Sequence, residues 1–477
     1  MGNIDLRNAR LNRELSLEQS RIEGEVYLHS ARIDSDLGFT GSRVAGSLSA
    51  TQLHHEQSVI LSNAVFEQEV TFAHAKIDGR VDMDGATFDR DLKAGSLQVG
   101  ASLFMRNGAS FKGVNLIGAN VASNVEMIGS TFDGDLNADS LQVGANLFMR
   151  NGAHFKGVIL RGAKVAGQVN MDGATFDGDL DADSLHVGDH LFMRNALYTH
   201  KVNAVFIKVD GNLDLRGAAL AELDLSGASV TGEFRVGSQG QSRPPTVWSR
   251  KEGAPGELSL RHTRIGSLLD TSDSWPKRDY LHLDGFSFAR LGGFEQQKES
   301  EARARGAKWW DEWARRDTHY SPHVYQQVAA AFTAAGDRNL GDEVRYLGQV
   351  REHEALTGRS WVWSALLRWV AGFGIGSYPF RVLYWVAAVS FVGALYLWTC
   401  TKGVQNGDHG FVWCWGASLA RLLPVIEINK EFTDFFNDPK RERLTDFQTF
   451  VFSFIGVLGW FLAAVLVAAV SGVTKRT

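Results

Sequence analysis

Apolar side chains recur in pairs at positions i and i+2 through residues 1–292, and a new pair begins every five or six residues. A helix spaces apolar residues three or four apart, so these pairs are typical of very short strands. Glycines such as Gly173 and Gly178 lie between the pairs and let the chain bend. Four such sides make a coil of about 22 residues. Clear pairs are Ala163 with Val165, Val169 with Met171, Ala174 with Phe176, Leu180 with Ala182, Leu185 with Val187 and Leu191 with Met193.

A longer repeat of 44 residues supports this coil length. Three segments, which begin at Val81, Val125 and Val169, align with close identity at this spacing, and 44 residues correspond to two coils. Stacked coils pair their strands roughly 4.8 Å apart. The pattern therefore predicts a right-handed β-helix (a β-solenoid) over residues 1–292, with on the order of thirteen coils and a length of roughly 60 Å.

The repeat unit also resembles a known family. A-x-(V/F), as at Ala163 to Val165 and Ala174 to Phe176, alternates with V-x-M. This rhythm resembles that of the pentapeptide-repeat proteins and related bacterial β-helices over more than half of the chain, which implies a right-handed β-solenoid. The family's Ala-Asp/Asn-Leu-x-x unit is not kept, and every second side is one residue longer. A regular square helix is therefore not predicted.

Acidic residues alternate along the segment DGDLDADS, at Asp177, Asp179, Asp181 and Asp183, which suggests a calcium-binding carboxylate ladder. The EF-hand and the calcium-binding β-roll both require glycines at positions where this chain has none. We interpret these residues as solvated faces of the solenoid. Several histidines resemble metal ligands, but nothing fixes a third ligand, so we expect them at the surface. They are His54, His55, His154 and His186.

An α-helical connector is expected over residues 293–358, where charged helix formers replace the two-residue rhythm. Ser321 as N-cap, Pro322 at the first helical position and Gly336 as the stop predict a helical hairpin. Its pattern resembles the hairpin that joins pentapeptide-repeat domains to a two-span, potassium-channel-like pore in some bacterial membrane proteins. A TPR-type hairpin would share much of this pattern. The residues that carry the match are Tyr325, Val328, Ala329, Phe332, Ala335, Gly336 and Asp337.

Two long uncharged segments, at about 382–400 and 450–473, predict transmembrane helices in a domain that covers residues 359–477. A buried core helix of a soluble protein would have a similar composition, but the flanking Arg381, Lys475 and Arg476 favour spanning helices. Basic residues precede the first span and follow the second, and the N-terminus has no apolar signal segment. We expect a multi-pass protein of the inner (cytoplasmic) membrane, with its N-terminal domain and C-terminus in the cytoplasm.

The segment between the spans contains an apolar stretch that Arg421, Pro424 and Glu427 make too polar for a third span. We expect a re-entrant helix there and take these three residues as candidate pore residues. Span, dipping helix and span resemble a two-transmembrane channel protomer. A potassium filter would read T-V-G-Y-G, whereas this chain has LLPVIEINKEFTDFF, so potassium selectivity is not implied. The entry to the first span resembles that of such channels at Phe373, Gly374, Pro379 and Arg381.

The second predicted span carries a stripe of small residues, Ala464, Ala468 and Gly472, at intervals of four. Stripes of this kind allow two helices to approach closely in lipid. We therefore take these three residues as candidates for helix packing and self-association.

Composition argues against several other functions. A net charge of -5 and a pI of about 6.3 give no reason to expect a nucleic-acid partner. The two cysteines, Cys400 and Cys414, belong to no CxxC or Cys/His cluster. GFGIGS misplaces the third glycine of a dinucleotide motif, and the chain has no GxSxG, HExxH or P-loop. We therefore expect that the protein is not an enzyme and that it has neither a cofactor site nor a metal site.

Two functions remain. The first is an oligomeric, channel-like or pore-forming membrane protein whose cytoplasmic solenoid senses or gates, and a membrane effector of bacterial defence is a specialised form of it. The second is a membrane-anchored scaffold without conduction, in which the solenoid binds a protein partner along its faces. Both have the lipid bilayer as a partner, and the first also requires a homo-oligomer.

Overall fold

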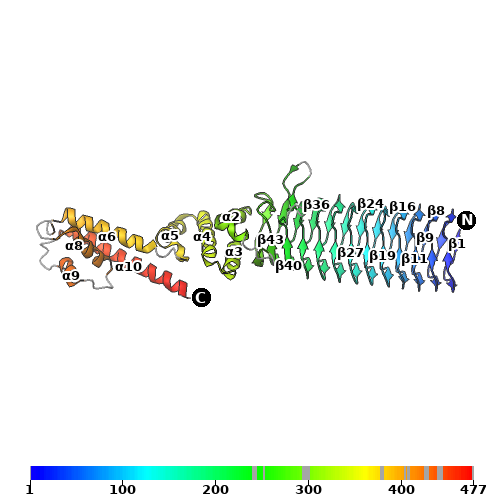
Figure 1. The fold of residues 1–477 in the computed structure, drawn as a ribbon, viewed down its shortest axis with the longest axis horizontal. Helices are drawn as coiled ribbons and strands as arrows, with labels where there is room; N and C mark the ends of the chain where they lie inside the picture. Colours follow the sequence, from blue (N-terminus) through cyan, green and yellow to red (C-terminus); the bar gives the residue numbers. More distant parts are fainter. Residues whose placement is uncertain are drawn as a thin grey trace. The chain divides into compact units, whose positions relative to one another are not determined.

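The computed structural model describes residues 2–238, 244–250, 253–292, 301–376, 381–401, 404, 409–423, 429–437 and 444–474. The chain divides into two compact units, Met1–Phe332 and Thr333–Thr477. The first contains a parallel β-solenoid of about 13 turns, followed by helices, and the second is helical (Figure 1).

Each regular turn of the solenoid contributes four short strands, two to each of two sheets. In the second turn, β4 (Arg21–Ile22) and β5 (Val26–Tyr27) join the 22-stranded sheet. The next two, β6 (Arg32–Ile33) and β7 (Leu37–Gly38), join the 23-stranded sheet. The predicted β-solenoid with four sides to a coil is confirmed.

Every strand from β1 (Ile4–Asp5) to β35 (Leu191–Phe192) has two residues. Each pairs in parallel with the equivalent strand of the next turn. In β4, Arg21 pairs with Arg43 of the next turn, and in β5, Val26 pairs with Leu48. The offset is 22 residues in both pairs (43 − 21 and 48 − 26). Coil length and stacking therefore follow the sequence repeat.

The 44-residue repeat has a structural cause. Thr87 pairs with Ser110, an offset of 23 residues, whereas Ser110 pairs with Thr131, an offset of 21. The extra residue is Gly108, whose φ of 79° lies in the left-handed region that glycine adopts without strain. One turn gains a residue at this corner and the next loses one, so only a pair of turns has a constant length.

A column of aromatic rings runs through the core. Successive rings are nearly parallel, and their centroids lie 4.7 to 5.1 Å apart. The stacking of the coils fixes this spacing, and each aromatic contact adds about 0.5–1.5 kcal/mol beyond the burial of its area. Burial also raises the pKa of the last member, Tyr198. The column consists of Phe66, Phe88, Phe111, Phe132, Phe155, Phe176 and Tyr198.

His55 lies in the core, so its predicted surface position is wrong. It occupies the inward position of β10 (His54–His55), where the adjacent turns have Ile33 and Ile77. Its two ring nitrogens lie 3.0 Å from the carbonyl oxygens of Ile33 and Ser58, so the buried ring keeps polar partners. His54, His154 and His186 lie at outward positions, as predicted.

Side chains at one corner of the coil bond to the backbone of the next turn. Asn124 Oδ1 accepts a hydrogen bond from the N–H of Asn146 at 3.1 Å, and Asn146 Oδ1 accepts one from Gln168 at 3.0 Å. Two turns further, His190 Nδ1 accepts a hydrogen bond from the N–H of Asn212 at 2.9 Å. These bonds satisfy backbone donors where the strand ladder is interrupted by a bend.

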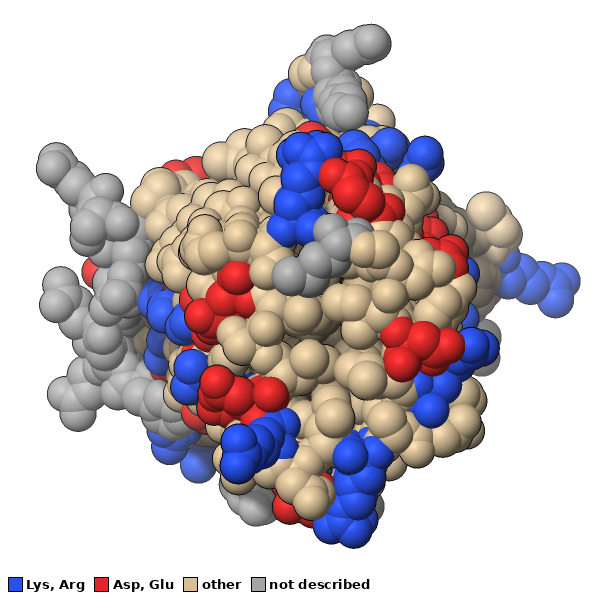
Figure 2. All heavy atoms as spheres, turned by 90° about the vertical axis from the view of Figure 1, so that its right-hand side faces the viewer, with Lys and Arg blue, Asp and Glu red and all other residues tan. Residues whose placement is uncertain are grey.

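The N-terminal end of the solenoid shows its cross-section. Charged side chains lie around the edge, and uncharged atoms fill the centre (Figure 2). Ile4 and Leu6 of the first turn point inward but are only half-buried. Their equivalents one turn later, Val26 and Leu28, are fully buried. The core is therefore closed from the second turn onward.

Beyond β35 several strands lengthen, because adjacent sides of the coil merge. Helix α2 (Gly306–Ala314) packs onto the last turns through two 2.8 Å hydrogen bonds from Arg305 to Asp270. The later strands are β36 (Leu197–Asn203), β37 (Lys208–Val209), β38 (Leu213–Asp214), β39 (Ala219–Asp224), β40 (Ser229–Arg235), β41 (Val247–Trp248), β42 (Glu257–Ser259), β43 (Arg264–Leu269), β44 (Leu281–His282) and β45 (Ser287–Leu291).

The two helices predicted on either side of Gly336 are α3 (Pro322–Ala334) and α4 (Arg338–Ala355), and Gly336 has a φ of 89°. The predicted spans lie in α6 (Arg381–Cys400) and α10 (Asp446–Thr474). The segment predicted as a re-entrant helix contains α8 (Phe411–Leu422). The remaining elements of this region are α5 (Gly358–Ala371), η2 (Gly372–Gly374) and α9 (Lys430–Phe436).

Candidate functional sites in the helical unit and on the solenoid

Helix α8 packs against both long apolar helices. Cys414 and Ala417 of α8 are fully buried in one cluster with Ala394 and Leu397 of α6 and Phe452 of α10. The outer side of the same helix is apolar and exposed, at Val412 and Trp415 among others. A short helix thus fills the space between two long ones and leaves an apolar surface uncovered.

Two glycines allow α8 to approach the long helices. A Cβ atom at Gly459 of α10 would lie 1.7 Å from the carbonyl oxygen of Leu422, and one at Gly393 of α6 would lie 2.2 Å from Ser418 Oγ. Backbone atoms of two helices therefore meet at Gly459, where no larger residue fits without moving α8.

Polar contacts tie this three-helix arrangement together. Trp415 Nε1 donates a hydrogen bond to Ser390 Oγ at 3.0 Å, which joins α8 to α6. At the C-terminal end of α6, Gln448 Nε2 of α10 donates to the carbonyl oxygen of Cys400 at 2.9 Å. Gln448 and Thr445 also bond reciprocally, through the pattern of a helix capping box. The start of α10 is thereby fixed to the end of α6.

Arg421 lies in the last turn of α8 and is half-buried. Its Nε donates a hydrogen bond to the carbonyl oxygen of Phe452 at 3.2 Å, and its guanidinium group lies 5.7 Å from the ring centroid of Phe436 in α9. The side chain therefore connects α8, α9 and α10. The other candidate pore residues, Pro424 and Glu427, lie outside the described residues, as does Pro379.

The small-residue stripe of α10 is described only in part. Ala464 is exposed, and the burial of Ala468 and of Gly472 lies outside what the structure describes. Self-association through this stripe stays a prediction.

The two long helices expose most of their apolar surface. Only 28% of the most apolar 18-residue stretch of α6 is buried in the protein. For the corresponding stretch of α10 the buried share is 22%. The core helix of a soluble protein would be mostly buried, whereas these helices are long and apolar enough to cross a membrane. The exposed large side chains include Leu383, Tyr384, Phe391, Val392, Phe450, Phe454, Val457 and Trp460.

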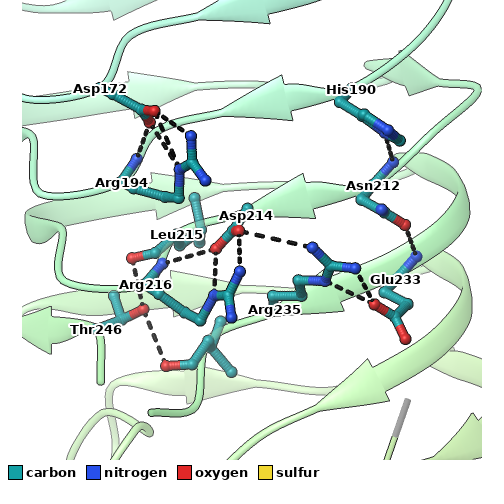
Figure 3. A network of polar contacts seen from close by, with 11 residues as sticks. Asp172, His190, Arg194, Asn212, Asp214, Leu215, Arg216, Glu233, Arg235 and Thr246 are labelled. Carbon is teal, nitrogen blue, oxygen red and sulfur yellow. Dashed lines mark hydrogen bonds and ion pairs between the residues drawn. The ribbon is translucent and has the colours of Figure 1, made fainter. Parts of the chain in front are cut away.

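Ion pairs between successive turns recur on one side of the solenoid and form an interrupted ladder, of which Figure 3 shows the pair Asp172 and Arg194. Arg194 Nε lies 3.0 Å from the carboxylate of Asp172, which precedes it by 22 residues, and Arg106 pairs in the same way with Asp84. Each of these arginines also lies over the phenylalanine two residues before it, with 4.4 Å between Arg194 and the ring centroid of Phe192. Carboxylate and aromatic ring together fix the guanidinium group.

Arg150 occupies the same position one repeat later than Arg106, but the residue 22 positions before it is Ile128 rather than aspartate. It lies over Phe148 at 4.8 Å. Its Nε atom is buried and has no hydrogen-bond partner among the described residues. Arg150 therefore occupies a ladder position that lacks the acidic partner.

The ladder continues into the interior where the strands lengthen. Asp214 and Arg216 are both fully buried and form an ion pair, and Arg235 extends the contact toward Glu233 (Figure 3). Thr246, from the segment that covers this corner, donates to the carbonyl oxygen of Leu215 at 2.9 Å. This network joins β38 to β40 and fixes the change in coil shape.

Sequence reasoning did not single out these arginines. The signal was present, because Met-Arg-Asn recurs at intervals of 44 residues, at Arg106, Arg150 and Arg194. The pairing with Asp84 and Asp172 becomes visible only when residues 22 apart are aligned as neighbours.

The acidic run does not gather into one site. Asp177 contacts His154, Asp179 accepts a hydrogen bond from the N–H of Lys201, and Asp181 contacts Arg161. In the part of the chain that the structure describes, no group of three or more His, Cys, Asp or Glu side chains is arranged to hold a metal ion.

No protein-family model, curated protein or solved structure matches this chain.

Proposed function

We propose that this protein is an oligomeric, channel-like membrane protein, in which the helical unit forms a pore or gate and the solenoid senses a signal or partner. The observation that carries the proposal is the position of α8, a short helix packed between two long apolar helices that are otherwise exposed. A protomer of this kind supplies two spans and one helix that enters the membrane without crossing it.

Length supports this division of roles. Helix α8 has 12 residues, or roughly 18 Å, which is shorter than the roughly 30 Å hydrocarbon core. With 20 and 29 residues, α6 and α10 are long enough to cross it. The apolar outer surfaces of all three helices call for lipid or other copies of the chain as neighbours.

The charge distribution supports one orientation. Arg359, Arg368 and Arg381 precede or begin the first span, and Lys475 and Arg476 follow the second. Basic residues prefer the cytoplasmic side, so we propose that the solenoid and both termini face the cytoplasm of a bacterial cell. A pore that opens on a signal from the solenoid would suit an effector of cell defence.

A membrane-anchored scaffold without conduction is the alternative. The contact of Arg421 with the Phe452 carbonyl favours it, because this arginine then packs helices together rather than facing an aqueous path. In that case the solenoid faces would bind a protein partner.

Reconstitution of the whole chain in liposomes distinguishes the two. We expect a defined oligomer that passes ions, and at least a tenfold loss of flux in Arg421→Leu, because α8 loses its bond to α10. The exposed Lys308 of α2 provides the control, and Lys308→Leu should leave flux unchanged. Tight vesicles under every tested ion gradient would exclude the pore and leave the scaffold.

A further inference from the structure

We propose that α5 lies flat in the headgroup region of the bilayer, with its indole rings at the boundary of the acyl chains and the exposed Arg359 on anionic phospholipid. The inference rests on the proposed membrane location of α6 and α10. It adds a lipid contact that neither spanning helix requires.

The apolar face of α5 points away from the protein. Val362, Leu366 and Trp369 follow one another at intervals of four and three residues, so they share one face of the helix, and they are 58%, 37% and 70% exposed. Ser364 and Arg368 lie on the opposite side and are half-buried. A helix on a water-exposed surface would show the reverse arrangement.

Tryptophan and arginine are residue types that are frequent at the surface of a membrane. Trp361 and Trp363 are also exposed on this helix, and Trp361 stacks on His353 of α4 with 5.6 Å between the centroids. Indoles prefer the headgroup level of a bilayer, because the ring is apolar and its N–H group needs a polar partner.

The charge of α5 has one sign. Arg359 and Arg368 are its only ionisable residues. A basic side chain near an anionic bilayer is attracted by its negative surface potential. The helix therefore complements anionic headgroups better than zwitterionic ones.

Contacts with α6 and α10 are consistent with a position of α5 at the level of the lipid headgroups. Trp385 Nε1 of α6 donates a hydrogen bond to the carbonyl oxygen of Trp369 at 3.1 Å. Ala371, at the end of α5, is buried in one cluster with Val382 of α6 and Leu462 of α10. With 14 residues, or roughly 21 Å, α5 is too short to cross the bilayer. The C-terminal end of α5 therefore lies near the start of α6, at the membrane surface, and the rest of α5 extends along that surface.

Site-directed spin labelling of the whole chain in vesicles tests this inference. The two native cysteines are replaced (Cys400→Ser, Cys414→Ala), and single labels are placed at Val362→Cys, Leu366→Cys and Trp369→Cys. Collision with oxygen and with a water-soluble nickel chelate gives the depth of each label. Gln349→Cys, on the exposed side of α4, is the aqueous control, and Val392→Cys, on the exposed side of α6, is the lipid control.

In vesicles that contain phosphatidylglycerol we expect the α5 labels at headgroup depth, between the two controls. The inference is overturned if the labels on α5 are as accessible to nickel as the label at Gln349→Cys while the label at Val392→Cys still lies in lipid. Labels shielded from both oxygen and nickel would mean that a second copy of the chain covers α5, which also overturns it. If Val392→Cys itself lies in water, the proposed membrane function fails first.

The electrostatic part has its own arm. Arg359→Glu should move the α5 labels toward water in phosphatidylglycerol vesicles and leave their depth unchanged in pure phosphatidylcholine. Equal depth in both lipids, with and without this substitution, would exclude recognition of anionic headgroups.

Discussion

Arg216 Nε lies 2.8 Å from the carboxylate of Asp214, and both side chains are fully buried inside the solenoid. Most charged residues of the solenoid lie at its surface, so this pair is an exception that the surrounding chain must support. The backbone N–H of Arg216 donates to the same carboxylate at 3.2 Å, and Arg235 lies 3.8 Å from it.

We predict that Asp214→Ala lowers the free energy of unfolding of the solenoid by about 3–5 kcal/mol, because it removes the carboxylate that compensates the buried charge of Arg216. Asp172→Ala is the matched control, since Arg194 lies near the surface and water can replace the carboxylate. Its cost should be about 1 kcal/mol. Urea unfolding followed by far-ultraviolet circular dichroism compares the two. Equal costs for both variants would contradict the assignment of a buried charge.

Arg150 offers the opposite test. We predict that Ile128→Asp stabilises the solenoid by about 0.5–1 kcal/mol, because it supplies the carboxylate that Asp84 and Asp172 supply to the equivalent arginines. The gain should vanish when Arg150→Ala is combined with it, and a double-mutant cycle of urea midpoints measures this coupling. Stabilisation that persists without the arginine would show that the new aspartate acts in another way.

The surroundings of Asp181 predict that the stability of the solenoid depends on pH. Burial alone would raise the pKa of this carboxyl, but hydrogen bonds from Arg161, from the N–H of Asp183 and from Asn203 together lower it. A carboxylate whose pKa is lower in the folded state stabilises the fold above its unfolded pKa, near 3.9. This contribution is lost as the pH falls through the lowered folded value.

Removal of the arginine should therefore change the acid limit. We expect Arg161→Gln to lose its circular dichroism signal at a higher pH than the native chain, because the pKa of Asp181 then moves up. Arg161→Lys keeps the positive charge and should follow the native curve closely. Acid curves of the glutamine variant and the native chain that coincide would show that Arg161 does not set this pKa.

The sequence was sufficient to predict the solenoid because its signal is local and repeated. Each pair such as Val169 and Met171 states which side chains face inward, and the 44-residue repeat sets the length of the coil. The same rhythm places His55 inward, because Leu53 and His55 form one of these pairs, and the surface prediction gave the polarity of histidine more weight than its position. The partner of Arg194, in contrast, is defined by stacking rather than by neighbouring sequence.

The helical unit divides in the same way. Hydropathy identified α6 and α10 and the shorter apolar segment between them. The position of α8 depends on the distance between the Leu422 carbonyl and Gly459, residues that are far apart in the sequence. A single sequence gives each helix but not the small residues at which two of them meet.

Gly459 provides the last prediction. We expect Gly459→Val to displace α8, because a Cβ atom would lie 1.7 Å from a backbone oxygen that cannot move separately from its helix. Gly456→Ala is the matched control on α10, since its nearest neighbours lie 3.7 Å away, an ordinary contact distance. If the proposed function holds, ion flux should fall at least tenfold in the first variant and stay unchanged in the second.

The two native cysteines report the displacement without any assay of flux. Cys414 lies on the buried side of α8, against α6 and α10, whereas Cys400 is exposed. A maleimide small enough to enter the lipid interface should label Cys400 alone in the native chain and in Gly456→Ala, but both cysteines in Gly459→Val. Because labelling depends on packing alone, it tests the position of α8 even where vesicles prove tight. Protection of Cys414 in Gly459→Val would mean that α8 tolerates the added methyl groups, and the close approach at Gly459 would then be dispensable.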